Sequence, residues 1–120
     1  MSRIERVNHQ MKREIGLILQ KELADPRFQM VTITAVEVSK DLRHAKVRFS
    51  VMGSKEQISR TTDGLNGAKG IIRKLVGENL SMRYTPELVF FYDASLEYSA
   101  NIDRALEEIR NEPKEDYPNN

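Results

Sequence analysis

Apolar side chains recur at helical spacing from about Arg3 to Ala24, the first stretch of the chain. Basic residues lie largely off this apolar stripe, so the segment predicts an amphipathic helix. Asp25-Pro26 ends the helix, because proline disfavours helical backbone for the residue before it. The stripe consists of Ile4, Val7, Met11, Ile15, Ile18, Leu19 and Leu23.

Two strands are predicted after this helix. Residues 29–39 are rich in β-branched side chains, and residues 43–52 alternate between apolar and polar, with a turn at residues 40–42 between them. One side of the second strand carries Ala45, Val47, Phe49 and Val51, and the other carries His44, Lys46, Arg48 and Ser50. The second set is either a basic binding surface or a charged strand that discourages aggregation.

A second helical pattern runs from Ser54 to Gly77. Ser54 and Gln57 have the spacing of a capping box, and apolar residues then recur at intervals of three and four. Glycines at positions 64, 67 and 70 interrupt the pattern, each at a cost of about 1 kcal/mol relative to alanine. The segment therefore predicts two helices that meet at a kink, where bare backbone lies beside positive charge.

The remaining pattern predicts a turn at 79–85, a third strand at 86–93 and a last helix that begins at Ser95. The third strand is an almost continuous apolar run, which predicts burial of its aromatic side chains in the core. Pro113 stops the last helix, and residues 112–120 are a polar tail. We therefore expect one α+β domain over residues 1–111, in which helices pack on one face of a three-stranded sheet.

Charge is unevenly distributed in this chain of 120 residues, although its net charge is only +1. Residues 1–83 hold 16 basic and 9 acidic residues, and residues 84–120 hold 3 basic and 9 acidic ones. A basic body with an acidic end favours a polyanionic partner, although ordinary surface charge also produces such asymmetry. The charged N-terminus is not a signal peptide, and no run is long enough to span a membrane. We expect a cytoplasmic protein.

No catalytic or cofactor chemistry is evident in the sequence. Cysteine is absent, and the two histidines, His9 and His44, lack the spacing of metal ligands. Neither a P-loop nor a nucleophile elbow is present. The glycines at 64, 67 and 70 lie in a helical pattern, which is not the context of a dinucleotide-binding fingerprint. We expect no enzyme, no metal and no cofactor.

The element order fits an RNA-binding module, the type II KH domain. KH domains clamp nucleotide backbone on a Gly-x-x-Gly loop between two helices. Residues 64–67 (Gly-Leu-Asn-Gly) and 67–70 (Gly-Ala-Lys-Gly) both match this short pattern. They follow two predicted strands and precede a third, as the KH topology requires.

The chain also resembles the ribosome-binding factor A family over residues 6–109. The matching segments include Met11-Lys12-Arg13-Glu14, Asp25-Pro26-Arg27, Val31-Thr32-Ile33-Thr34, Asp41-Leu42, Ala45-Lys46-Val47, Ala68-Lys69-Gly70, Pro86-Glu87-Leu88 and Tyr92-Asp93-Ala94-Ser95. The resemblance implies a KH-like fold whose helix pair meets at an Ala-x-Gly kink, here Ala68, Lys69 and Gly70, in place of a Gly-x-x-Gly loop. It also implies a non-catalytic factor that binds the immature 30S subunit and its 16S rRNA, and we expect this factor to be a monomer. Such a factor supports maturation near the 16S 5′ end, notably in the cold.

Basic residues on three parts of the chain are the candidate RNA-binding set. Phosphate contacts place a protein on RNA without reading its sequence, and Gly70 allows close approach of backbone. The first set is Arg43, Lys46, Arg48, Lys69, Gly70, Arg73, Lys74 and Arg83. Arg6, Lys12 and Arg13 on the first helix are further candidates, although solvated helix charge is the commoner explanation there. The alternative function is a protein-interaction module that docks through a sheet edge or the acidic last helix.

Overall fold

The computed structural model describes residues 1–95. The predicted last helix beyond Ser95, the tail at 112–120 and the domain boundary at 111 lie outside these residues. Within them, none of the helices is both long and apolar enough to cross a lipid bilayer. The elements are α1 (Arg3–Leu17), a π-helical turn (Ile18–Glu22), a 3-10 turn (Pro26–Phe28), β1 (Thr32–Val38), β2 (His44–Ser50), α2 (Lys55–Gly67), α3 (Lys69–Asn79) and β3 (Glu87–Tyr92).

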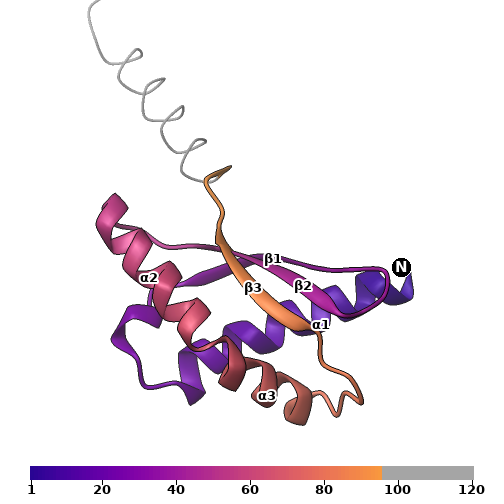
Figure 1. Ribbon diagram of the computed structural model, residues 1–120. Coiled ribbons are helices and arrows are strands. Elements are labelled where there is room, and N and C mark those ends of the chain that lie inside the picture. The colour runs from indigo at the N-terminus through magenta and orange to yellow at the C-terminus, as the bar shows by residue number, and fades with distance from the viewer. Residues whose placement is uncertain (96–120) are drawn as a thin grey trace, which may run out of the picture.

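The three strands form one mixed sheet in the order β1-β2-β3. β1 and β2 pair antiparallel through a short turn, whereas β2 and β3 pair parallel because the chain crosses over through α2 and α3. All three helices lie on one side of this sheet (Figure 1). The predicted α+β, KH-like architecture with helices on one face is confirmed.

The core lies between the sheet and the helix layer. Val36, Val47 and Phe90 stand in register across the three strands, and each is at most 4% exposed. Against them pack buried side chains from all three helices, including Met11, Ile15, Leu65, Ile72 and Val76. One buried face of a sheet and one buried stripe per helix explain the two periodicities of the sequence.

The first helix begins as expected and ends differently. Ser2 and Glu5 form a capping box that supports the start of α1. The prediction of a regular helix to Ala24 is wrong over its last turn, where the Leu23 N–H donates to the Ile18 carbonyl at 3.1 Å, a π-type bond. This wider turn accompanies the complete burial of both Ile18 and Leu19.

The predicted burial of the aromatic side chains of β3 in the core is right for Phe90 and wrong for Phe91. Leu88 and Phe90 point into the core, but Val89 and Phe91 are 37% and 43% exposed on the opposite face. β3 is an outer strand of a sheet whose second face carries no layer from residues 1–95, so alternate side chains meet solvent. An apolar run alone does not distinguish this half-exposed strand from a fully buried one.

Candidate RNA interface

The kink between α2 and α3 consists of a single non-helical residue, Ala68. Its backbone has φ −94° and ψ 1°, and its N–H donates to the carbonyls of Gly64 (3.0 Å) and Leu65 (3.1 Å). α2 includes Gly67 and α3 starts at Lys69, so neither Gly-x-x-Gly match forms an open loop. The structure therefore places the bend within the predicted Ala68-Lys69-Gly70 segment.

The surface at the kink is open beside its later glycines. A Cβ atom built on Gly67 or Gly70 meets nothing within 4 Å, whereas one built on Gly64 meets the Arg27 guanidinium carbon at 2.8 Å. Lys69 stands exposed between the two open positions. Gly64 thus accommodates a neighbouring side chain, and Gly67 and Gly70 leave backbone accessible from outside.

Arg27 is a cation at the kink that is absent from the predicted RNA-binding set. Its guanidinium binds the Asp25 carboxylate, with 2.7 Å between Nη2 and Oδ2, and lies 5.7 Å from the centre of the Phe28 ring. The hydrogen bond from the Arg27 side chain lowers the pKa of Asp25. Asp25 offsets much of the charge of Arg27, so this pair holds the loop against Gly64 and adds little net positive charge. The sequence signal that could have pointed to Arg27 is the Asp25-Pro26-Arg27 segment, which is one of the segments shared with the family.

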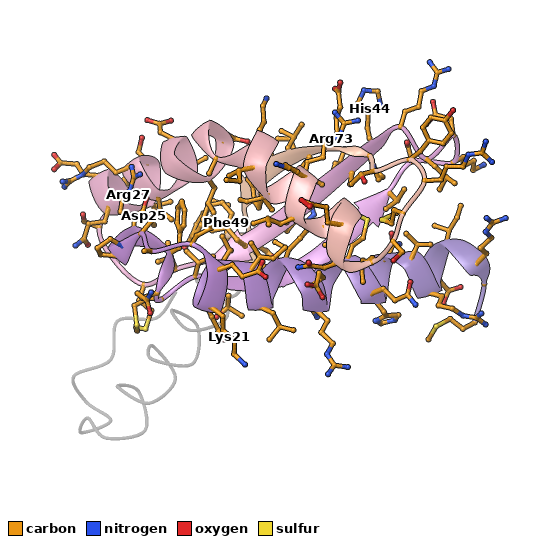
Figure 2. The ribbon with its side chains drawn as sticks, turned by 90° about the horizontal axis from the view of Figure 1, so that it is seen from below. Lys21, Asp25, Arg27, His44, Phe49 and Arg73 are labelled. Carbon is orange, nitrogen blue, oxygen red and sulfur yellow. The ribbon has the colours of Figure 1, made fainter. Side chains whose placement is uncertain are left out.

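Arg73 has a structural partner. Its Nε atom donates to the Thr85 carbonyl at 2.9 Å, which ties α3 to the segment before β3. Arg73 also lines a hollow with Arg43, and Figure 2 shows Arg73 and His44 on the same side of the molecule. Two predicted residues from distant parts of the sequence are thereby brought together. Asp41 and Glu87 line the same hollow, so its charge is mixed.

Lys46 and Arg48 lie on the open face of the sheet, on the other side from the helices. Arg48 is paired there with Glu37 of β1, with 3.1 Å between Nε and Oε1. In register on β3, Val89 stands beside Lys46 and Phe91 beside Arg48. The open face is therefore a mixed apolar and basic surface, and it lies on the other side of the sheet from the helix layer that carries Lys69 and Lys74.

The other candidates are spread over the helix layer and its loops. Arg6, Lys12 and Arg13 are exposed on α1, and the last two line a shallow hollow beside β1. Arg83 lies in the segment between α3 and β3, next to the exposed Tyr84. The predicted residues therefore form several separate basic surfaces. Tyr84 was missed because a single tyrosine in a predicted turn carries no pattern.

No group of three metal-ligating side chains occurs in residues 1–95. Asp41 and Asp93 both have a lowered pKa, chiefly because each carboxylate accepts a hydrogen bond from a nearby serine hydroxyl, Ser39 or Ser95. These carboxylates are ionised at neutral pH and act as hydrogen-bond acceptors for neighbouring turns.

A small α+β layer with a kinked helix pair, exposed cations and accessible glycine backbone at the kink places the chain in the class of KH-like proteins. The family model for ribosome-binding factor A matches residues 3–106. The chain belongs to the ribosome-binding factor A family.

Individual relatives agree with this assignment. The chain is 45% identical to ribosome-binding factor A of Halothermothrix orenii, in an alignment that covers 95% of this chain and 93% of the relative. It is 48% identical to ribosome-binding factor A of Acetivibrio thermocellus, in an alignment that covers 90% of this chain and 89% of the relative. The crystal structure of ribosome-binding factor A from Thermus thermophilus has a TM-score of 0.67 and 25% identity, covering 76% of this chain and 97% of that chain. A second solved structure is a homology model of the Thermus thermophilus factor, fitted into a cryo-electron-microscopy map of its complex with 30S. It has a TM-score of 0.61 and 26% identity, and the match covers 72% of this chain and 91% of that chain. Membership of a non-catalytic family confirms the prediction that the chain is not an enzyme.

Proposed function

We propose that this chain is a non-catalytic assembly factor that binds the immature 30S ribosomal subunit through 16S rRNA. The observation that carries the proposal is the shared fold with a factor fitted into the map of a 30S complex. The binding partner is polyanionic, which suits the 16 basic residues concentrated in residues 1–83. The protein acts as a monomer in the cytoplasm and supports maturation near the 16S 5′ end, including growth in the cold.

The phosphate contacts come from the basic surfaces on both sides of the sheet. On the helix side, Lys69 and Lys74 are exposed on α3, and neither has an ion-pair partner within residues 1–95. Gly70 lies between them and leaves room for an RNA backbone. Arg43 and Arg73 supply charge at the mixed hollow, and Lys46 and Arg48 supply it on the open sheet face. Arg83, Arg6, Lys12 and Arg13 extend the contact surface.

Co-sedimentation with purified immature 30S subunits over a range of salt concentrations tests the proposal. We expect binding that weakens steeply with salt, because each neutralised phosphate releases counterions. The double variant Lys69→Ala/Lys74→Ala should bind more weakly, and Lys55→Ala, an exposed lysine at the start of α2, is the control. Arg73 is left intact because its loss would also remove the hydrogen bond to Thr85. Binding that is absent, or indifferent to salt, would refute the proposal.

A cellular experiment tests the role in maturation. In bacteria that lack their own ribosome-binding factor A, production of this chain should restore growth in the cold. It should also reduce the amount of 16S rRNA with an unprocessed 5′ end, measured by primer extension. Restored subunit binding without processing would limit the function to binding.

The alternative of a protein-interaction module finds less support at the sheet edges. The outward N–H of Val38 on β1 donates to the Asn8 side chain at 2.9 Å, and the Asn66 amide pairs with Phe90 on β3. Strand addition would have to displace these side chains. The predicted acidic last helix lies outside the described residues. Subunit association that survives both high salt and ribonuclease would favour this alternative.

A further inference from the structure

A hollow of about 550 Å³ lies where three segments of the chain meet. These are the start of α1, the turn between β1 and β2, and the segment between α3 and β3. Its apolar walls include Ile4, Leu42 and Met82. The volume falls in the range of small-molecule sites, which combine an apolar lining with a few polar groups. None of its lining residues belongs to the kink or to the open sheet face.

The polar groups at this hollow are cations. Arg3, Lys40 and Arg83 line it, one from each of the three segments, and no carboxylate residue lines it. Within residues 1–95, none of these three cations forms an ion pair. The neighbouring hollow shares Leu42 and Tyr84 with this one but differs because Asp41 and Glu87 also line it. An anionic ligand therefore fits the first hollow much better than the second.

An aromatic ring stands at the same place. Tyr84 lines the hollow and is 79% exposed, and Leu42 beside it is 38% exposed. Leu42 adopts left-handed backbone (φ 62°), a conformation that is unfavourable for a residue with a Cβ atom. An exposed tyrosine next to arginine and lysine is the combination with which proteins hold unstacked bases.

We propose that this hollow binds one unstacked nucleotide of a single-stranded RNA segment. The base lies against the Tyr84 ring and the apolar wall, and the flanking phosphates contact Arg3, Lys40 and Arg83. Double-stranded RNA presents phosphates but no free base faces, so it would leave the ring and the apolar wall unused. An acidic peptide would use the cations but has no flat aromatic base to stack. The inference rests on the proposed RNA-binding function. It adds to the phosphate contacts a site where one base of the RNA stacks on Tyr84.

The test uses the full chain and a ten-nucleotide unstructured RNA that carries one 2-aminopurine base. Stacking of this base on an aromatic ring quenches its fluorescence, so the signal reports on the proposed contact directly. We expect quenching on binding, retention of quenching in Tyr84→Phe, and its loss in Tyr84→Ser, with affinity roughly ten- to hundred-fold weaker. Met52→Ala, an exposed apolar residue away from the hollow, is the matched control and should behave as wild type. Circular dichroism establishes that each variant is folded.

The outcomes separate this inference from the proposed function. Equal quenching and affinity in Tyr84→Ser and wild type, or no quenching in wild type, would overturn the nucleotide site. If the Lys69→Ala/Lys74→Ala variant still lost 30S binding, the proposed function would stand without this site. Loss of binding in Arg83→Ala but not in Tyr84→Ser would indicate a phosphate contact without a stacked base, which also overturns the inference. Quenching that depends on Tyr84, in a protein that fails to bind 30S, would support the site and refute the proposed subunit partner.

Discussion

Asn66 illustrates how one side chain stabilises the outer edge of this sheet. Its amide nitrogen donates to the Phe90 carbonyl at 3.2 Å, and its amide oxygen accepts from the Phe90 N–H at 3.0 Å. Phe90 is 1% exposed, so its outward backbone groups would otherwise have no ready access to water. Asn66 therefore fixes α2 to β3 and also occupies a position where another strand could pair.

Replacement of Asn66 by alanine should destabilise the protein. Two partly buried backbone groups of Phe90 would lose their partners, at a cost of about 2 kcal/mol in the free energy of unfolding. Urea denaturation of Asn66→Ala measures this loss. Gln20→Ala, an exposed residue on the π-helical turn, should change the free energy by less than about 0.5 kcal/mol. Equal stability of the two variants would contradict the role assigned to Asn66.

Asp93 gives the fold a dependence on pH. Its carboxylate accepts hydrogen bonds from the Ser95 hydroxyl at 2.6 Å and the Thr34 hydroxyl at 2.8 Å, and these lower its pKa below 3.8, the ordinary value. The charged form is favoured in the folded state, so its stabilisation is present above the ordinary pKa and is lost as pH falls through the lowered one. Urea denaturation from pH 7 to pH 2 should therefore show Asp93→Asn less stable than wild type at neutral pH, with the difference shrinking in acid. A constant difference across this range would exclude the carboxylate as its source.

At the level of elements, the kink joins two helices that each contain glycine, and the glycines have different roles. Gly64 faces Arg27, whereas Gly70 in the first turn of α3 faces open space. Glycine in a helix costs about 1 kcal/mol relative to alanine. Within residues 1–95, a Cβ atom at Gly70 would meet no neighbouring atom, so packing does not explain the glycine. The proposed approach of an RNA backbone to Gly70 does explain it.

Gly70→Ala should separate stability from binding. The added methyl group meets no atom within 4 Å, so we expect the free energy of unfolding to rise by about 0.5 to 1 kcal/mol. Affinity for 30S subunits should fall, because the methyl group would keep an RNA backbone away from the helix. Thermal denaturation and co-sedimentation measure the two effects, and Gly67→Ala, which is equally open, is the comparison on α2. A more stable variant with unchanged affinity would remove Gly70 from the interface.

The elements differ in how well the sequence predicts them. The kink was predictable to within a residue or two, because the capping box at Ser54, the glycine spacing and the apolar stripe are all local signals. The exposure of Val89 and Phe91 was not, because it depends on β3 lying at the edge of a sheet with one uncovered face. The bond from Leu23 to Ile18 depends on packing in the same way. The same holds for the candidate site. The sequence shows which residues are basic, but it does not show on which surface of the fold each of them lies.

At the scale of the whole molecule, the sheet separates the basic residues into two layers. Lys69 and Lys74 lie with the helices, and Lys46 and Arg48 lie on the uncovered face of the sheet. A single flat RNA surface cannot contact both layers at once. Contact through both would require rRNA segments on either side of the protein, and contact through one would leave the other layer free.

Two double variants and their combination distinguish these arrangements. Lys69→Ala/Lys74→Ala should reduce the slope of log affinity against log salt by about 1.4, since each phosphate contact to single-stranded RNA contributes about 0.7. Lys46→Ala/Arg48→Ala should reduce it by less, because Arg48 is already paired with Glu37. The two sets share no partner, so their effects on the free energy of 30S binding should add in the quadruple variant if rRNA contacts both layers. A quadruple variant that binds no more weakly than Lys69→Ala/Lys74→Ala would show that rRNA reaches only the helix layer, because charges on an untouched face contribute little at physiological salt.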